Sequence, residues 1–541
     1  MNSGISKRAY ATPFLKFWDD LIGFCQFFGL AMLMVSLPFS NFFMSVFSFW
    51  LVGAWMLDVA TNIRLGRGES VKQSAKKFLQ NEAAIIFTGL YLFLLIGLFW
   101  TDDFTYAWKD LLVKLPLLFM PFLVLSLRPI AENKFRLLLA IFIAALSVAA
   151  IICLINYAGW PANTHGDVRE ISIFISHIRF SLLLALGICI VLIVFTKEKK
   201  WRFVSILIAL FFLYFLWVIE SITGFSVLCA VAAWFLFSKI FSSRLMMMRF
   251  VASALLIGGS VSLLLYLKNC YHNYFTAEII DWNQLEEWTP RGEQYEHRPE
   301  NHQLENGHYI FTYIAWGEVF SGWRQRSALH PDSADALGHP VKGTLIRYLT
   351  SKGLRKDLDG IALLTDDDVR SIERGTTSAR QHEKSGIRSR IDKILFEYDV
   401  YRNGGNPSGH SVLQRIEFWR VAWAIITENF WAGTGTGDIR SAYQAQYEKM
   451  NSRLDAEHRL RAHNQYLTFW ATLGIFGLLW FVWVIVHPVV FAKRWRDPLF
   501  MSFIIIAALS CLAEDTLETQ AGVTFFAFMF SLLIARPLPQ A

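Results

Sequence analysis

The chain has 541 residues, of which 54% are hydrophobic and only 18% are charged, and its formal net charge is +7. A soluble chain of this length would divide into two or more domains with charged surfaces, so the composition excludes that class. The apolar residues fall in blocks of about 17–25 residues, the length that a helix needs to cross a bilayer. The positive charge does not indicate a nucleic-acid partner, because the sequence has no basic stripe and no aromatic RNA-binding motif. We therefore expect an all-α, polytopic membrane protein.

About twelve transmembrane helices are expected along the chain. The first follows a polar, basic N-terminal stretch and lacks a small-residue cleavage site, which predicts an uncleaved helix. The pattern predicts nine spans in residues 1–268, a large and mainly helical loop in residues 269–464, and three spans in residues 465–541. The expected spans lie near residues 21–38, 41–60, 83–100, 108–127, 136–156, 178–196, 201–219, 222–240, 249–268, 465–490, 498–513 and 519–535.

The loops between these spans alternate in charge, which predicts the orientation. One set is rich in Lys and Arg, as in the loop that holds Lys72, Lys76 and Lys77. The other set is short and neutral or acidic, as at Asp102 and Asp103. Because cytoplasmic loops carry the excess of basic residues, we expect an inner-membrane protein with cytoplasmic termini and a periplasmic large loop.

Arg179 begins the predicted span 178–196, at the end where the other loops carry few basic residues. A long cationic side chain that reaches the interface is one explanation for this position. A functional cation at the mouth of the span is the other.

The large polar loop offers no metal site by its spacing. Only Cys270 of the six cysteines borders it, and no pair of cysteines is spaced as a metal site or a disulfide framework. The acidic run 366–368 follows Thr365, which favours a capped helix start over a metal-binding motif. A further helix is expected near residues 343–352.

Arg415 opens a stretch in which Trp419 and Trp423 are one helical turn apart, a spacing more typical of packing or interface anchoring than of sugar stacking. The glycine-rich turn 433–437 follows it. This turn lacks the dinucleotide-binding pattern. It either ends a helix or presents backbone N–H groups to a phosphate, and the sequence leaves both open.

His463 lies in the polar run 461–467, at the mouth of the predicted span 465–490. Polar groups are expensive at this depth and usually have a function. Histidine is also the side chain best suited to proton transfer near neutral pH. The alternative is an interfacial histidine that bonds water or a carbonyl group.

The order Arg-x-x-x-Trp, glycine-rich turn, and His-Asn-x-Tyr-Leu before an apolar helix spans roughly residues 411–480. It resembles the O-antigen ligase and polymerase superfamily. The resemblance implies transfer of a glycan from undecaprenyl diphosphate to a hydroxyl of a lipid A–core acceptor, within membrane lipids and without a metal or other cofactor. A polymerase or a protein O-oligosaccharyltransferase of the same superfamily is an alternative that the sequence does not separate.

The resemblance also implies roles for particular residues. His463 is the expected general base for the acceptor hydroxyl, and Arg415 the expected catalytic cation. Arginine suits a diphosphate because its planar fork binds phosphate oxygens bidentately. The candidates for diphosphate binding are Arg179, Arg420, Arg461 and Asn464.

Two further points bear on function. The segment 281–409 makes the loop longer than the loop of the family, which puts the acceptor in doubt and leaves the donor unaffected. A transporter without chemistry is the alternative from another class. It should show charged or broken spans near the midplane and two similar halves, whereas the ionisable residues here gather at outer span ends.

Overall fold

The computed structural model describes residues 13–65, 67–158, 171–379, 387–402 and 404–538. These ranges are predominantly helical. The strands described in them are only β1 (Leu304–Glu305) and β2 (His308–Tyr309), which pair antiparallel. The expected all-α class is confirmed.

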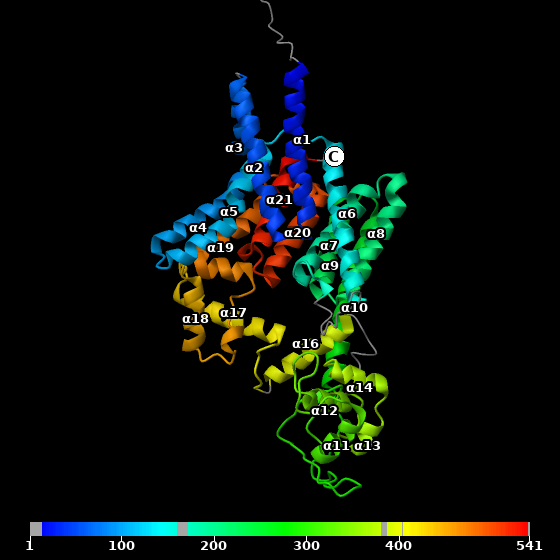
Figure 1. Cartoon of the computed structure of the whole chain (residues 1–541). Coiled ribbons are helices and arrows are strands. Elements are labelled where there is room, and N and C mark those ends of the chain that lie inside the picture. The colour runs from blue at the N-terminus through cyan, green and yellow to red at the C-terminus, as the bar shows by residue number, and fades with distance from the viewer. Residues whose placement is uncertain (1–12, 66, 159–170, 380–386, 403, 539–541) are drawn as a thin grey trace, which may run out of the picture.

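The apolar helices form one bundle, and the polar region lies at one end of it (Figure 1). Helix α1 begins, and α21 ends, on the side of the bundle away from the polar region. The bundle helices are α1 (Pro13–Ser36), α2 (Asn41–Arg64), α4 (Glu82–Ile96), α5 (Phe104–Ser126), α6 (Glu132–Tyr157), α7 (His177–Ile190), α8 (Lys199–Val218), α9 (Ile222–Ser242), α10 (Met246–Phe275), α19 (Gln465–Val490), α20 (Pro498–Ala513) and α21 (Gln520–Ala535).

Each predicted span therefore corresponds to a helix, but three of these helices do not have the length and composition of a membrane span. Nine helices of the described ranges are long and apolar enough to cross a membrane. Helices α20 and α21 are apolar but shorter, and α5 contains three Lys or Asp side chains. The chain is a multi-pass membrane protein, and the count of twelve spans stays a prediction. One additional helix, α3 (Gly68–Leu79), was not predicted.

Polar side chains cap many of these helices at their first turn. The side-chain oxygens of Asn81, Asp103, Asn464, Asp497 and Thr519 each accept a backbone N–H at the start of α4, α5, α19, α20 and α21. Free backbone N–H groups at a helix start are costly where water is scarce. The caps therefore fix where each helix begins.

Helix α19 is broken at Gly474, whose φ of 67° lies in the left-handed region. Backbone groups freed by the break bond to the chain around the glycine-rich turn 433–437. This replaces hydrogen bonds that the helix loses, as buried backbone requires. The bonds run from Thr434 N–H to Ala471 O (2.9 Å), from Gly435 N–H to Thr472 O (3.0 Å) and from Ile475 N–H to Phe430 O (2.9 Å).

The polar region contains two apolar cores of its own. One includes Trp323 and Leu345, and the other includes Phe418 and Tyr447. Its helices are α11 (Trp316–Arg326), α12 (Val341–Ser351), α13 (Leu358–Ala362), α14 (Asp366–Glu373), α16 (Ile387–Arg402), α17 (Ser411–Glu428) and α18 (Ile439–Lys449). Short 3₁₀ turns lie at η1 (Gly97–Trp100), η4 (Ala456–His458), η5 (Arg494–Arg496) and η6 (Thr516–Glu518), and a π-helical turn at η3 (Val191–Phe195).

The predicted helix start at Thr365 is confirmed, because Thr365 and Asp368 form a reciprocal capping box at α14. Each neighbouring carboxylate is also paired with its own cation, since Asp366 contacts Arg326 and Asp367 contacts Arg370. The acidic run is therefore built as a helix terminus. The helix expected near residues 343–352 is α12, which begins two residues earlier.

The orientation of the bundle is a prediction that cysteine labelling can check. In a variant without the native cysteines, Ala334→Cys in the polar region should react with a membrane-impermeant thiol reagent in intact spheroplasts. Lys76→Cys in α3 should react only after permeabilisation, because its basic loop is expected to face the cytoplasm. The opposite pattern would invert the topology.

Candidate active site

His463 stands in a strained loop directly before α19. Its φ is 46°, a left-handed value that is uncommon for residues other than glycine. Asp515 stabilises this conformation, since its two carboxylate oxygens accept the N–H groups of His463 (3.1 Å) and Asn464 (3.0 Å). The Asp515 carboxylate also accepts the hydroxyl of Thr468 at 2.8 Å. The loop that presents the imidazole is thus tied to the connection between α20 and α21.

The carboxylate of Glu514 is where the predicted residues meet. Nδ1 of His463 lies 3.8 Å from it, and Nη2 of Arg415 lies 3.4 Å from it. Burial alone would raise the pKa of Glu514, but the nearby His463, Arg415 and Arg179 hold that pKa below its ordinary value. Glu514 is therefore an anion that partly neutralises a cationic site.

Arg179 approaches the same carboxylate from α7. It lines a narrow, mainly apolar cavity together with Glu514 and with side chains of α7, α20 and α21. Leu182, Ile506 and Phe525 are among its apolar walls. Arg179 also borders a more open, polar hollow beside Asn41. The side chain therefore stands where an apolar space meets a polar one.

Helix α17 supports the imidazole with its aromatic face. The Phe418 ring packs against the His463 ring at a centroid distance of 5.6 Å, and Nε1 of Trp419 donates a hydrogen bond to the carbonyl of Ala462 at 3.0 Å. Trp423 packs edge-on against Trp470 of α19. These contacts agree with the packing role that the sequence predicts for Trp419 and Trp423.

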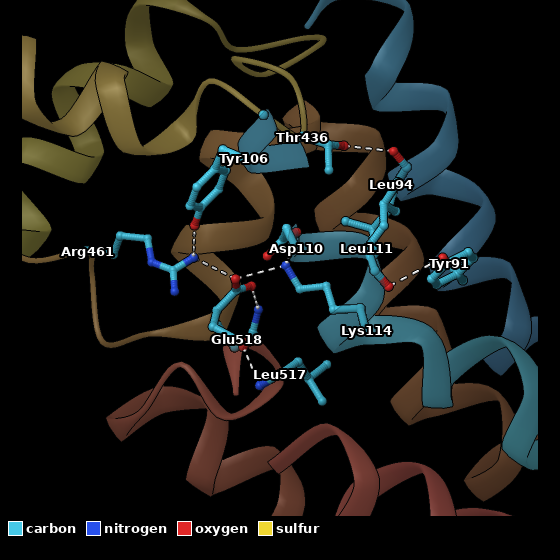
Figure 2. Close-up of polar contacts among 12 residues, drawn as sticks. Tyr91, Leu94, Tyr106, Asp110, Leu111, Lys114, Thr436, Arg461, Leu517 and Glu518 are labelled. Carbon is cyan, nitrogen blue, oxygen red and sulfur yellow. Dashed lines mark hydrogen bonds and ion pairs between the residues drawn. The ribbon is translucent and has the colours of Figure 1, made fainter. Parts of the chain in front are cut away.

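Beside this site lies a buried network of charges (Figure 2). Lys114 of α5 contacts Asp110 at 2.6 Å and Glu518 at 2.8 Å, and all three side chains are almost fully buried. Glu518 also receives Arg461 at 2.6 Å, and Arg461 reaches the hydroxyl of Tyr106 at 3.2 Å. Two cations and two anions thus compensate one another where α5 packs against the connection before α21.

The structure places the remaining candidates differently. Arg461 is engaged by Glu518, and the side-chain oxygen of Asn464 caps α19. Arg420 has a side chain 60% exposed, and its described ion-pair partner is Glu417 rather than Glu514. A role for these three residues in diphosphate binding stays a prediction. Unlike Arg415 and Arg179, they do not lie beside Glu514.

The sequence analysis missed the acidic groups that organise the site. Glu514 and Asp515 were interpreted only as polar caps of spans and Glu518 was not considered, although these three acids lie within five residues between two apolar blocks. The spacing of Asp110 and Lys114, one turn apart inside an apolar helix, was a second available signal. Because this pair lies inside α5, ionisable residues are not confined to the outer ends of the spans.

The glycine-rich turn is structural. The N–H groups of Gly433, Thr436 and Gly437 bond to Asn429, Gly97 and Thr101, and those of the two residues between them bond to α19. All five N–H groups therefore have protein acceptors, so the phosphate alternative is wrong for this conformation. The turn therefore closes the break in α19 through backbone hydrogen bonds.

A glycine is required where the turn approaches α19. A Cβ at Gly433 would lie 2.4 Å from the carbonyl oxygen of Thr472, and a Cβ at Gly474 would lie 2.0 Å from the carbonyl oxygen of Trp431. Both glycines also have positive φ. The motif thus serves close backbone packing.

Fold and site together define a class: a multi-pass membrane protein in which a histidine and an arginine meet at one carboxylate beside a polar region, with a second arginine lining the adjacent cavity. Residues 375–482 match the family described as O-Antigen ligase. This segment is therefore similar to O-antigen ligases, which confirms the resemblance drawn from its motifs.

The matched segment includes Arg415, the glycine-rich turn and His463, whereas Arg179 and Glu514 lie outside it. Members of the family are glycosyltransferase-like enzymes, and the match supports a function of the O-antigen ligase or polymerase type. Comparison with curated proteins found no match.

Proposed function

We propose that the protein is an inner-membrane glycosyltransferase that transfers a glycan from undecaprenyl diphosphate to a lipid A–core acceptor on the periplasmic face. The observation that carries the proposal is the meeting of His463 and Arg415 at Glu514, with Arg179 lining the same cavity. Nδ1 of His463 and Nε of Arg415 are both buried, and neither has a hydrogen-bond partner among the described residues. Unpaired buried polar groups of this kind favour a polar ligand.

The diphosphate of the donor would compete with Glu514 for Arg415 and Arg179. Arginine forks bind phosphate oxygens bidentately, so the two cations would stabilise the negative charge that develops on the leaving diphosphate. The apolar cavity beside Arg179 suits the first units of the lipid chain. Glu514, released from the arginines, would remain beside Nδ1 of His463.

His463 would then act on the acceptor. The carboxylate of Glu514, 3.8 Å from Nδ1, would stabilise a protonated imidazole, and Nε2 would accept the proton. The acceptor hydroxyl loses its proton to Nε2, its oxygen bonds to the anomeric carbon, and the bond from that carbon to the diphosphate breaks. Undecaprenyl diphosphate leaves with the bonding electrons.

The experiment that tests this function is the surface glycan of a deletion strain. Loss of a ligase gives core without O-chains while lipid-linked polymer accumulates, and complementation restores the chains. Core capped by a single repeat would identify a polymerase, and a protein acceptor would leave the lipopolysaccharide unchanged.

Transfer by purified protein should persist in excess EDTA, because arginines supply the charge stabilisation. Loss of activity that a divalent ion restores would contradict metal independence.

Lysine should not fully replace either arginine of the site. Arg415→Lys and Arg179→Lys keep the charge but lose the bidentate fork, so each should retain part of the activity, whereas alanine should leave almost none. Transfer rate against donor concentration checks this, with Arg440→Lys on the exposed face of α18 as the control. Kinetics equal to those of the wild type in both site variants would make the arginines interface anchors.

A further inference from the structure

The polar region contains a second cavity, which lies outside the segment matched by the O-antigen ligase family. It has a volume of about 260 Å³ and is formed where the chain around β2 meets the turn after α12. Its lining includes Glu278, His308, Tyr309, Tyr313 and Lys356. The active site described above uses none of these residues.

Lys356 is the unusual member of this lining. Only 3% of the residue is exposed. Its Nζ has one hydrogen bond within the described ranges, to the carbonyl of Tyr309 at 3.3 Å, and no carboxylate of those ranges lies within ion-pair distance. Buried ammonium groups are normally paired, because the uncompensated charge is expensive. This cation faces a cavity instead of a counter-ion.

The acids near Lys356 are already engaged by other groups. Glu278 accepts Nδ1 of His308 at 2.6 Å and the N–H of Tyr309 at 3.1 Å. Asp357 accepts the hydroxyl of Tyr295 and the N–H of Gly360. Among the described residues, no carboxylate is therefore left to pair directly with Lys356, and an anionic ligand could take that place.

The remaining walls are suited to a ring with polar edges. Tyr309 and Tyr313 contribute aromatic side chains, and Arg355 stacks over the Tyr313 ring at 4.7 Å while Glu286 holds its guanidinium. Nδ1 of His308 is bonded to Glu278, so Nε2 is the ring nitrogen left for another partner. Nε2 lies 3.2 Å from the Cβ position of Gly353, a residue with φ +67°. A side chain at Gly353 would crowd this edge of the imidazole.

We propose that this cavity binds a sugar that carries a carboxylate or phosphate group, with Lys356 as the counter-ion of that group. The choice of a sugar rests on the proposed function, because a glycan transferase encounters acidic sugars in its donor or its acceptor. The aromatic walls and the buried cation are independent of that function. The site would then help to hold one substrate at a distance from His463.

Binding should depend on pH in a definite direction. Burial lowers the pKa of Lys356 to about 7, although Glu278 and Asp357 oppose this effect. The amine must be protonated to pair with an anion, so affinity should fall as pH rises from about 6 to about 9. The other ionisable groups that line the cavity are Glu278, which contacts His308, Arg355, which is paired with Glu286, and the hydroxyls of Tyr309 and Tyr313.

The test is calorimetric titration of the full-length protein in detergent with glucuronate, glucose 6-phosphate and, as a neutral control, glucose. We expect both anions to bind at pH 6 and glucose to bind much more weakly. Lys356→Met should weaken binding of the anions about tenfold or more, the effect of losing a charge-assisted hydrogen bond. Lys342→Met, at an exposed lysine of α12 that pairs with Asp332, should leave binding unchanged.

Folding of the key variant can be monitored separately. Because methionine removes a buried cation without a counter-ion, Lys356→Met should keep or raise the melting temperature. If it unfolds the protein, the wild type still decides the question through its preference for glucuronate over glucose and its loss of affinity at high pH. Equal binding of glucose, no binding of either anion, or full binding by folded Lys356→Met would overturn the proposal.

Transfer kinetics then distinguish the two sources of the sugar. A raised KM for the acceptor glycolipid in Lys356→Met assigns the site to the acceptor, and a raised KM for the lipid-linked donor assigns it to the donor. Because the titrations use monosaccharides, they do not depend on transfer. Anion binding without any transferase activity would therefore contradict the proposed function and leave this site standing.

Discussion

Replacing His463 with alanine should lower the transfer rate by about 10²–10⁴-fold, the usual effect of losing a general base. The imidazole stands in a strained loop and packs against Phe418. Its Nδ1 forms no hydrogen bond with the described residues, so alanine would remove no such bond from the fold. The variant should therefore insert and accumulate normally. Most of the loss should appear in kcat.

The measurement is complementation of the deletion strain, followed by gel analysis of its glycolipids and by transfer kinetics of the purified protein. His458→Ala is a matched control, because His458 precedes His463 in the same polar segment and lies beside Glu457 rather than Glu514. Normal long-chain product from His463→Ala would remove His463 from the mechanism. A similar loss in both variants would indicate a folding defect of the segment.

Replacing Glu518 with glutamine should destabilise the folded protein by about 3–5 kcal/mol, the range found when one partner of a buried ion pair is removed. Glu518 is the shared partner of Lys114 and Arg461, and its side chain is only 2% exposed. Without it, Lys114 would retain Asp110 as its ion-pair partner, whereas Arg461 would lose the one ion pair that it forms among the described residues. The lost stability should appear as a lower melting temperature in detergent.

A second substitution tests whether charge balance is the cause. Lys114→Met added to Glu518→Gln leaves one cation and one anion, so it should recover part of the lost stability. The double variant also loses a hydrogen bond to Asp110, which limits the recovery. A double variant less stable than Glu518→Gln alone would show that packing, and not the unpaired cation, is responsible. An unchanged melting temperature in the single variant would mean that water reaches the network.

The sequence by itself determined the class of fold and the position of the motif. Helix-length apolar blocks identify a membrane bundle because each crossing needs enough apolar residues to span the hydrocarbon layer. The motif around Arg415 and His463 was also recognisable from the sequence, because its residues lie close together in the chain. Both conclusions depend only on short-range order.

Tertiary structure alone decided which groups meet. Arg179, Arg415 and Glu514 belong to α7, α17 and the end of α20, and no spacing along the chain predicts that they share one site. The sequence left the glycine-rich turn open between a helix end and a phosphate site, and only the bonds of its N–H groups to Asn429, Gly97, Thr101 and the broken helix α19 decided between them. The cavity at Lys356 likewise appears only when α12 packs beside β2. These features arise from packing between distant segments, where a buried charge or backbone group must find a partner whose position the local sequence does not encode.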